Sequence, residues 1–87
     1  MKVSVLMGGT SAERDVSLKT GEAVLKACLE LGYEALPINF NGDYVSIFND
    51  LKYSDIVFNA LHGTIGEDGT IQTWLDDNNI NYTGSGS

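Results

Sequence analysis

The alternation of short apolar runs with helical patterns is the feature that most constrains the fold of this chain. Val3–Met7 is apolar and β-branched and is ended by Gly8-Gly9, as expected of a strand followed by a turn. Predicted strands and helices alternate along the chain, beginning with a strand, over residues 3–7, 17–31, 33–40, 44–51, 55–61, 71–78 and 80–83. This order predicts a parallel sheet joined by right-handed crossovers.

The first predicted helix begins at Asp15 or Ser17 and ends at Leu31, before Gly32. Its apolar face is formed by residues three or four apart: Leu18, Gly21, Val24, Leu25, Cys28 and Leu31. Cys28 is the single cysteine, so we interpret it as a buried small hydrophobe in a protein from a reducing compartment.

The strand order follows from two of the apolar runs. Pro37 lies inside 33–40, and a proline favours an edge position. Residues 55–61 are almost continuously apolar, which is typical of a central strand covered on both faces. We therefore predict an α/β, three-layer Rossmann-like domain with strand order 2-1-3-4 and helices on both faces. Ligands of such sheets bind beyond the carboxyl ends, at the switch point between strands 1 and 3.

Two polar loops follow those two strands, at Met7–Ser17 and His62–Gly69, so we predict that they line one cleft. The first loop lacks the G-x-G-x-x-G and P-loop patterns of phosphate sites. Glu13 and Asp15 would also repel an anion at this helix start. Glu13 is interpreted in two ways: it complements the helix dipole, or it binds the ammonium group of a ligand.

His62 is interpreted either as a structural hydrogen-bonding residue or as a functional wall of the same cleft. A zinc site is disfavoured because no second histidine and no cysteine lie at ligand spacing from His62. Ser11 and Ser17 have no evident base partner, so the sequence gives little support to nucleophilic catalysis.

The charge distribution excludes several kinds of partner. Twelve acids against five bases give a net charge of −7, which disfavours nucleic acid and anionic membranes. Residues 53–87 contain no Lys or Arg, so the chain alone is a poor nucleotide site. No apolar run approaches the roughly 18–20 residues of a membrane span. We expect a cytoplasmic protein.

Three segments in order resemble the N-terminal domain of bacterial D-alanine–D-alanine ligases. They are Gly8–Ser17, Ala60–Gly63 running into Gly66–Gln72, and Tyr82–Gly86. Thr73 departs from the glycine that the family commonly has at this position. The resemblance implies the first, pre-ATP-grasp domain of a three-domain ATP-grasp enzyme, which we place at residues 1–83. Residues 84–87 would begin a linker to the later domains.

The family's reaction and site residues are implied by the same resemblance. These ligases phosphorylate one D-alanine to D-alanyl phosphate with ATP and Mg²⁺ (or Mn²⁺), and the amine of a second D-alanine completes the peptidoglycan dipeptide. Glu13 would hold the first ammonium, Val16 and His62 would line that subsite, and Glu13 and His62 would be catalytic. ATP and metal would be bound by later domains, so the isolated fragment is predicted to be inactive. The resemblance also implies a homodimer.

Two alternatives stay open at this point. A flavodoxin-like or receiver-like module has a similar pattern of elements, although a receiver should have acidic residues after strand 1, where this chain has Gly8-Gly9. A D-alanine–D-lactate ligase would share this domain, because the second substrate is chosen largely beyond residue 87.

Overall fold

The computed structural model describes residues 1–9, 12–61 and 70–84. Its helices and strands alternate as predicted, with bounds β1 Lys2–Gly8, α1 Arg14–Glu30, β2 Glu34–Phe40, α2 Tyr44–Lys52, β3 Ile56–Asn59, α4 Thr70–Asp77 and β4 Tyr82–Gly84. The bounds differ most at the start of α1, predicted at Asp15 or Ser17, and at β3 and β4, predicted as 55–61 and 80–83. After β3 the Ala60 N–H still donates to the Leu6 carbonyl at 2.8 Å, but the chain then leaves the ladder.

The four strands form one sheet in the order β2-β1-β3-β4, and every neighbouring pair is parallel. This confirms the predicted fold class and strand order. β2 is an edge strand, and its Pro37 lies opposite Val5 of β1. An edge strand tolerates proline because only one of its sides must donate backbone hydrogen bonds.

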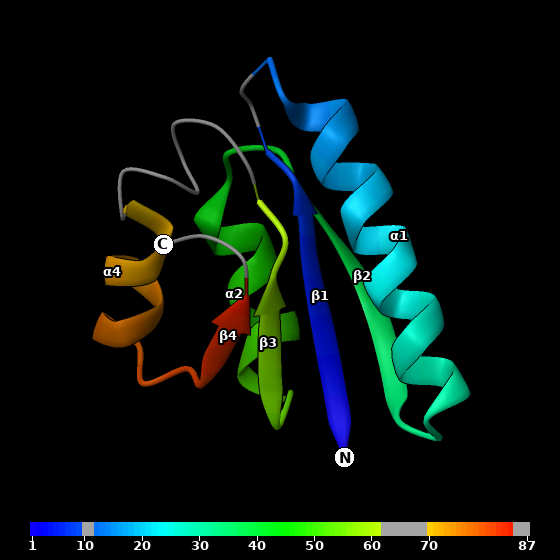
Figure 1. Ribbon diagram of the computed structural model, residues 1–87. Coiled ribbons are helices and arrows are strands. Elements are labelled where there is room, and N and C mark those ends of the chain that lie inside the picture. The colour runs from blue at the N-terminus through cyan, green and yellow to red at the C-terminus, as the bar shows by residue number, and fades with distance from the viewer. Residues whose placement is uncertain (10–11, 62–69, 85–87) are drawn as a thin grey trace.

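Helices cover both faces of the sheet (Figure 1), with α1 on one side and α2 and α4 on the other. Alternate residues of β1 point to opposite faces. Val3, Val5 and Met7 pack against the α1 side, whereas Leu6 belongs to the core beneath α2 and α4. The core on that second side is the larger and consists of Leu6, Ile38, Phe40, Ile47, Leu51, Val57, Leu61, Ile71 and Leu75.

Helix α1 ends in a Schellman motif, the arrangement that its predicted glycine stop favours. Gly32 has φ +90°, its N–H donates to the Leu29 carbonyl, and the Tyr33 N–H donates to the Cys28 carbonyl, each at 3.1 Å. Leu31 is 71% exposed, so its predicted place on the apolar face is wrong. Leu31 is the C-cap residue, one position beyond the last residue of the helix, Glu30.

Helix α2 is capped by Asp43, whose carboxylate accepts the N–H groups of Val45 and Ser46 at 3.0 and 3.3 Å. Aspartate is one of the residues preferred at the N-cap because its carboxylate can accept these free N–H groups. The rings of Tyr44 and Trp74 join α2 to α4, with centroids 5.1 Å apart. Val45 is 81% exposed and lines a surface hollow between the two helices.

Candidate functional site

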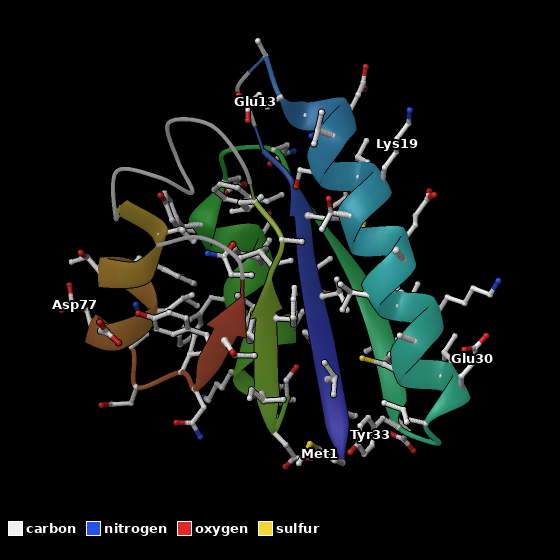
Figure 2. All side chains as sticks on the ribbon, viewed as in Figure 1. Met1, Glu13, Lys19, Glu30, Tyr33 and Asp77 are labelled. Carbon is white, nitrogen blue, oxygen red and sulfur yellow. The ribbon has the colours of Figure 1, made fainter. Side chains whose placement is uncertain are left out.

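The carboxyl ends of β1 and β3 lie side by side, because these strands are parallel neighbours with Leu6 opposite Asn59. The segment that follows β1 leads to Glu13, which Figure 2 places at this end of the sheet, just before α1. The segment that follows β3 passes through Ala60 and Leu61, both buried. The two predicted loops therefore start from adjacent strands at the predicted switch point.

The turn after β1 depends on two glycines with positive φ, Gly8 at +96° and Gly9 at +88°. The Gly9 N–H donates to the Phe40 carbonyl at 2.8 Å, which ties the turn to the end of β2. A Cβ on Gly8 would lie 2.8 Å from the Arg14 Nη1 and 2.8 Å from the Asn39 Oδ1. A side chain at Gly8 would therefore displace the guanidinium group that packs there.

Arg14 directs its guanidinium at the ends of the first two strands. Its Nη1 donates to the carbonyls of Gly9 and Phe40 at 2.8 and 3.1 Å, and its Nη2 donates to the Asn39 Oδ1 at 2.7 Å. The planar fork of an arginine suits such convergent acceptors. The one base of the Gly8–Ser17 stretch thus stabilises backbone carbonyls, and its charge is directed into the fold.

Ser17 joins three segments of the site. Its hydroxyl accepts the Gly8 N–H at 2.9 Å and donates to the Ala60 carbonyl at 2.6 Å. Its backbone N–H donates to the Glu13 carbonyl at 3.0 Å. Ser17 is fully buried, and the β1 end, the β3 end and the start of α1 all converge on it.

Asn59 fixes the start of the second segment. Its side chain is 2% exposed, and its Oδ1 accepts the Leu61 N–H at 3.1 Å. This local contact replaces the ladder hydrogen bond that the chain gives up as it leaves the sheet. The direction in which β3 leads toward His62 is therefore set by a buried amide.

The predicted site residues are only partly described. Glu13 is exposed and occupies the N-cap position of α1, although its side chain accepts no capping hydrogen bond. Val16 is 52% exposed in the first turn of the same helix. His62 lies outside the described residues. The structure thus brings Glu13 and Val16 to the same helix start, and the predicted contact of either residue with His62 stays a prediction.

Two acids, Glu13 and Asp15, stand at the start of α1 together with the bases Arg14 and Lys19. The parts of the chain that the structure describes hold no group of three or more His, Cys, Asp and Glu residues that could bind a metal ion. Burial and the nearby Asp76 carboxylate raise the pKa of Tyr82. Tyr82 lies on β4 and takes no part in this site. Within the described residues no helix has the length and apolar character needed to cross a membrane.

The hydrogen-bonding roles of Arg14 and Ser17 are not predicted by the sequence. Ser17 has no evident base partner there, and Arg14 is only one of five bases. One signal for Ser17 was available: it precedes Gly21 by four residues, and so it extends the predicted buried face of α1 with a hydroxyl. A polar group on a buried face needs a hydrogen-bonding partner.

Known proteins share both the sequence and the fold of this chain. The family model described as "D-ala D-ala ligase N-terminus" matches residues 42–85. D-alanine–D-alanine ligase of Pseudothermotoga lettingae is 52% identical over 85 residues, which are 98% of this chain and 29% of that protein. The chain therefore spans less than a third of this relative's length.

Solved structures agree with the sequence matches. The crystal structure of D-alanine–D-alanine ligase from Bacillus anthracis complexed with ATP has a TM-score of 0.82 and 36% identity, over 95% of this chain and 29% of that one. The VanG D-Ala:D-Ser ligase from Enterococcus faecalis has a TM-score of 0.73 and 25% identity, over 93% of this chain and 34% of that one. The chain belongs to the D-alanine–D-alanine ligase family and corresponds to the N-terminal part of these enzymes.

Proposed function

We propose that this chain is the N-terminal domain of an ATP-dependent D-alanine–D-alanine ligase and contributes the subsite for the first D-alanine. The placement of Glu13 carries the proposal. Glu13 is exposed at the start of α1, at the carboxyl end of β1 and next to β3. This is where parallel α/β sheets bind their ligands. The family membership favours this function over a flavodoxin-like or receiver-like module.

In this proposal the Glu13 carboxylate pairs with the ammonium group of D-alanine through a charge-assisted hydrogen bond. Val16 offers an exposed apolar surface one helical turn further along α1, suited to the methyl group of the substrate. His62 forms the facing wall. Pairing of the ammonium group with Glu13 would leave the substrate carboxylate free to react.

In this proposal the described residues do not bind ATP or Mg²⁺. Arg14 is directed at strand-end carbonyls, and Lys52 lies at the end of α2, over the Phe48 ring at 5.9 Å. Multiply charged phosphates need several convergent bases or a metal ion. We propose that further domains of the same chain bind ATP and Mg²⁺, and that the reaction passes through D-alanyl phosphate to the peptidoglycan dipeptide. A cytoplasmic homodimer is part of this proposal.

The 87-residue chain by itself is expected not to turn over, because its described residues lack the groups that would bind the phosphates of ATP. The measurement is phosphate release from ATP in the presence of D-alanine and Mg²⁺. The full-length ligase serves as the positive control. Phosphate release by the purified 87-residue chain that depends on D-alanine would contradict the expectation.

Replacing Glu13 by glutamine in the full-length enzyme is expected to raise the half-saturating concentration of the first D-alanine by about 5- to 150-fold. This range corresponds to the loss of roughly 1–3 kcal/mol from a charge-assisted contact. Glutamine keeps the shape of the side chain, so the change removes mainly the charge. Steady-state kinetics at saturating ATP measure it.

Glu22→Gln is the matched control for this experiment. Glu22 is an exposed acid on the same helix, further from the sheet end, so its replacement changes the net charge equally and should leave D-alanine binding unchanged. Equal half-saturation in wild type and Glu13→Gln would refute the role of Glu13.

The identity of the second substrate is a separate matter. The similarity extends to a solved D-Ala:D-Ser ligase, so this fold occurs in enzymes of different second-substrate choice. A D-alanine–D-lactate ligase therefore keeps its place as the alternative. Assaying the full-length enzyme with D-alanine, D-serine and D-lactate as competing second substrates decides between them.

A further inference from the structure

We propose that Ser17 is a positioning residue of the first D-alanine subsite, which holds the Glu13 segment at a set position relative to the end of β3. The inference rests on the proposed function of Glu13. It starts from the three hydrogen bonds of Ser17, which join residues from three elements of the fold.

The hydroxyl of Ser17 both accepts and donates a hydrogen bond. It accepts the Gly8 N–H, so it holds the end of β1, and it donates to the carbonyl of Ala60, so it holds the end of β3. Ser17, Gly8 and Ala60 are buried, and water cannot replace these contacts at low cost. The oxygen thus fixes the separation of the two segments that leave the sheet.

The backbone of Ser17 connects this junction to Glu13. The Ser17 N–H donates to the Glu13 carbonyl at 3.0 Å, in the first hydrogen-bonded turn of α1. A shift of Ser17 relative to β3 therefore moves Glu13 as well. Because binding geometry depends on displacements of well under an ångström to about one ångström, loosening this junction should weaken the subsite without touching the substrate.

A role in stability alone would leave a different signature. A purely structural serine would, when replaced, lower the stability of the enzyme and change its kinetics independently of Glu13. A positioning residue acts through Glu13, so its effect must depend on whether Glu13 is present. A double-mutant cycle separates these two possibilities.

The experiment uses the full-length ligase with Ser17→Ala, Glu13→Gln and both together. Ser17→Ala removes the hydroxyl and with it the hydrogen bonds to Gly8 and Ala60. It should raise the half-saturating concentration of the first D-alanine about tenfold and leave that of ATP unchanged. In the Glu13→Gln background the same change should have an effect of less than about threefold. Ser17→Cys has a similar size and only a weak donor and acceptor, so it gives the same comparison if Ser17→Ala does not fold.

Ser46→Ala is the matched control. The Ser46 hydroxyl also donates to a backbone carbonyl, that of Asp43 at 2.9 Å, but it lies on the exposed face of α2. This variant should bind D-alanine like the wild type.

Two outcomes overturn the inference. One is an unchanged half-saturating concentration of D-alanine in Ser17→Ala. The other is a double variant in which this concentration rises by the product of the two single-variant effects. The proposed function fails separately, when Glu13→Gln binds D-alanine as tightly as the wild type.

Discussion

Replacing Phe40 by alanine is expected to lower the free energy of unfolding of this domain by about 3–5 kcal/mol. The Phe40 ring is fully buried in the core beneath α2 and α4, and it contacts the Tyr44 ring at 5.1 Å between centroids. Alanine would leave a cavity there and remove the contact between β2 and α2. A domain of this length has only roughly 4–13 kcal/mol in total, so the loss is a large fraction.

Equilibrium unfolding in urea measures this change, with Tyr53→Ala as the matched control. Tyr53 is also aromatic but is 71% exposed, and its removal should change stability by no more than about 0.5 kcal/mol. Phe40→Leu should lower the free energy of unfolding by an intermediate amount, about 1–1.5 kcal/mol. This variant can still be measured if Phe40→Ala is unfolded. Equal effects of Phe40→Ala and Tyr53→Ala would contradict the assigned core.

Replacing Gly21 by valine should destabilise the domain by about 3 kcal/mol, because α1 lies too close to β1 for a side chain at this position. A Cβ on Gly21 would lie 2.7 Å from both the Cβ and the Cε of Met7 and 2.9 Å from its Sδ. The Cε can move, but the Met7 Cβ is attached to the backbone of β1. The helix must therefore shift away from the sheet.

Two further variants test the cause of the Gly21 effect. Gly21→Ala should destabilise less, because alanine adds one carbon and gains about 1 kcal/mol of helix propensity. Ala23→Val places the same β-branched residue on the exposed side of α1 and should cost at most about 0.5–1 kcal/mol. The assigned close packing is wrong if Gly21→Val and Ala23→Val have the same unfolding free energy.

Much of the fold was predictable because its signals are local and repeat along the chain. The apolar period of 14–30 indicates a helix wherever that helix is placed, and Gly32 ends it through a conformation that glycine adopts easily. Pro37 predicted the edge strand because of its missing N–H. Exact ends were less predictable, since β3 and β4 end where pairing with a neighbour ends.

The candidate site was predictable in position but only partly in its contacts. Parallel alternation places the ends of strands 1 and 3 together, and this placed Glu13 at the correct edge of the sheet. The contact with His62 stays a prediction. The three hydrogen bonds that Arg14 donates were not predictable, because Gly9, Asn39 and Phe40 become neighbours only when β2 lies beside β1.

The sequence by itself determined the alternation of elements and the strand order, and the resemblance of three segments indicated the family. The alternation and the strand order depend on the period of apolar residues and on single backbone-restricted residues, which are local properties of the sequence. Only the tertiary structure decided that Ser17 is a junction between Gly8 and Ala60 and that Gly21 is a point of contact with Met7. The physical reason is that hydrogen bonds and close contacts between distant residues depend on strand register and helix placement, which no local pattern specifies.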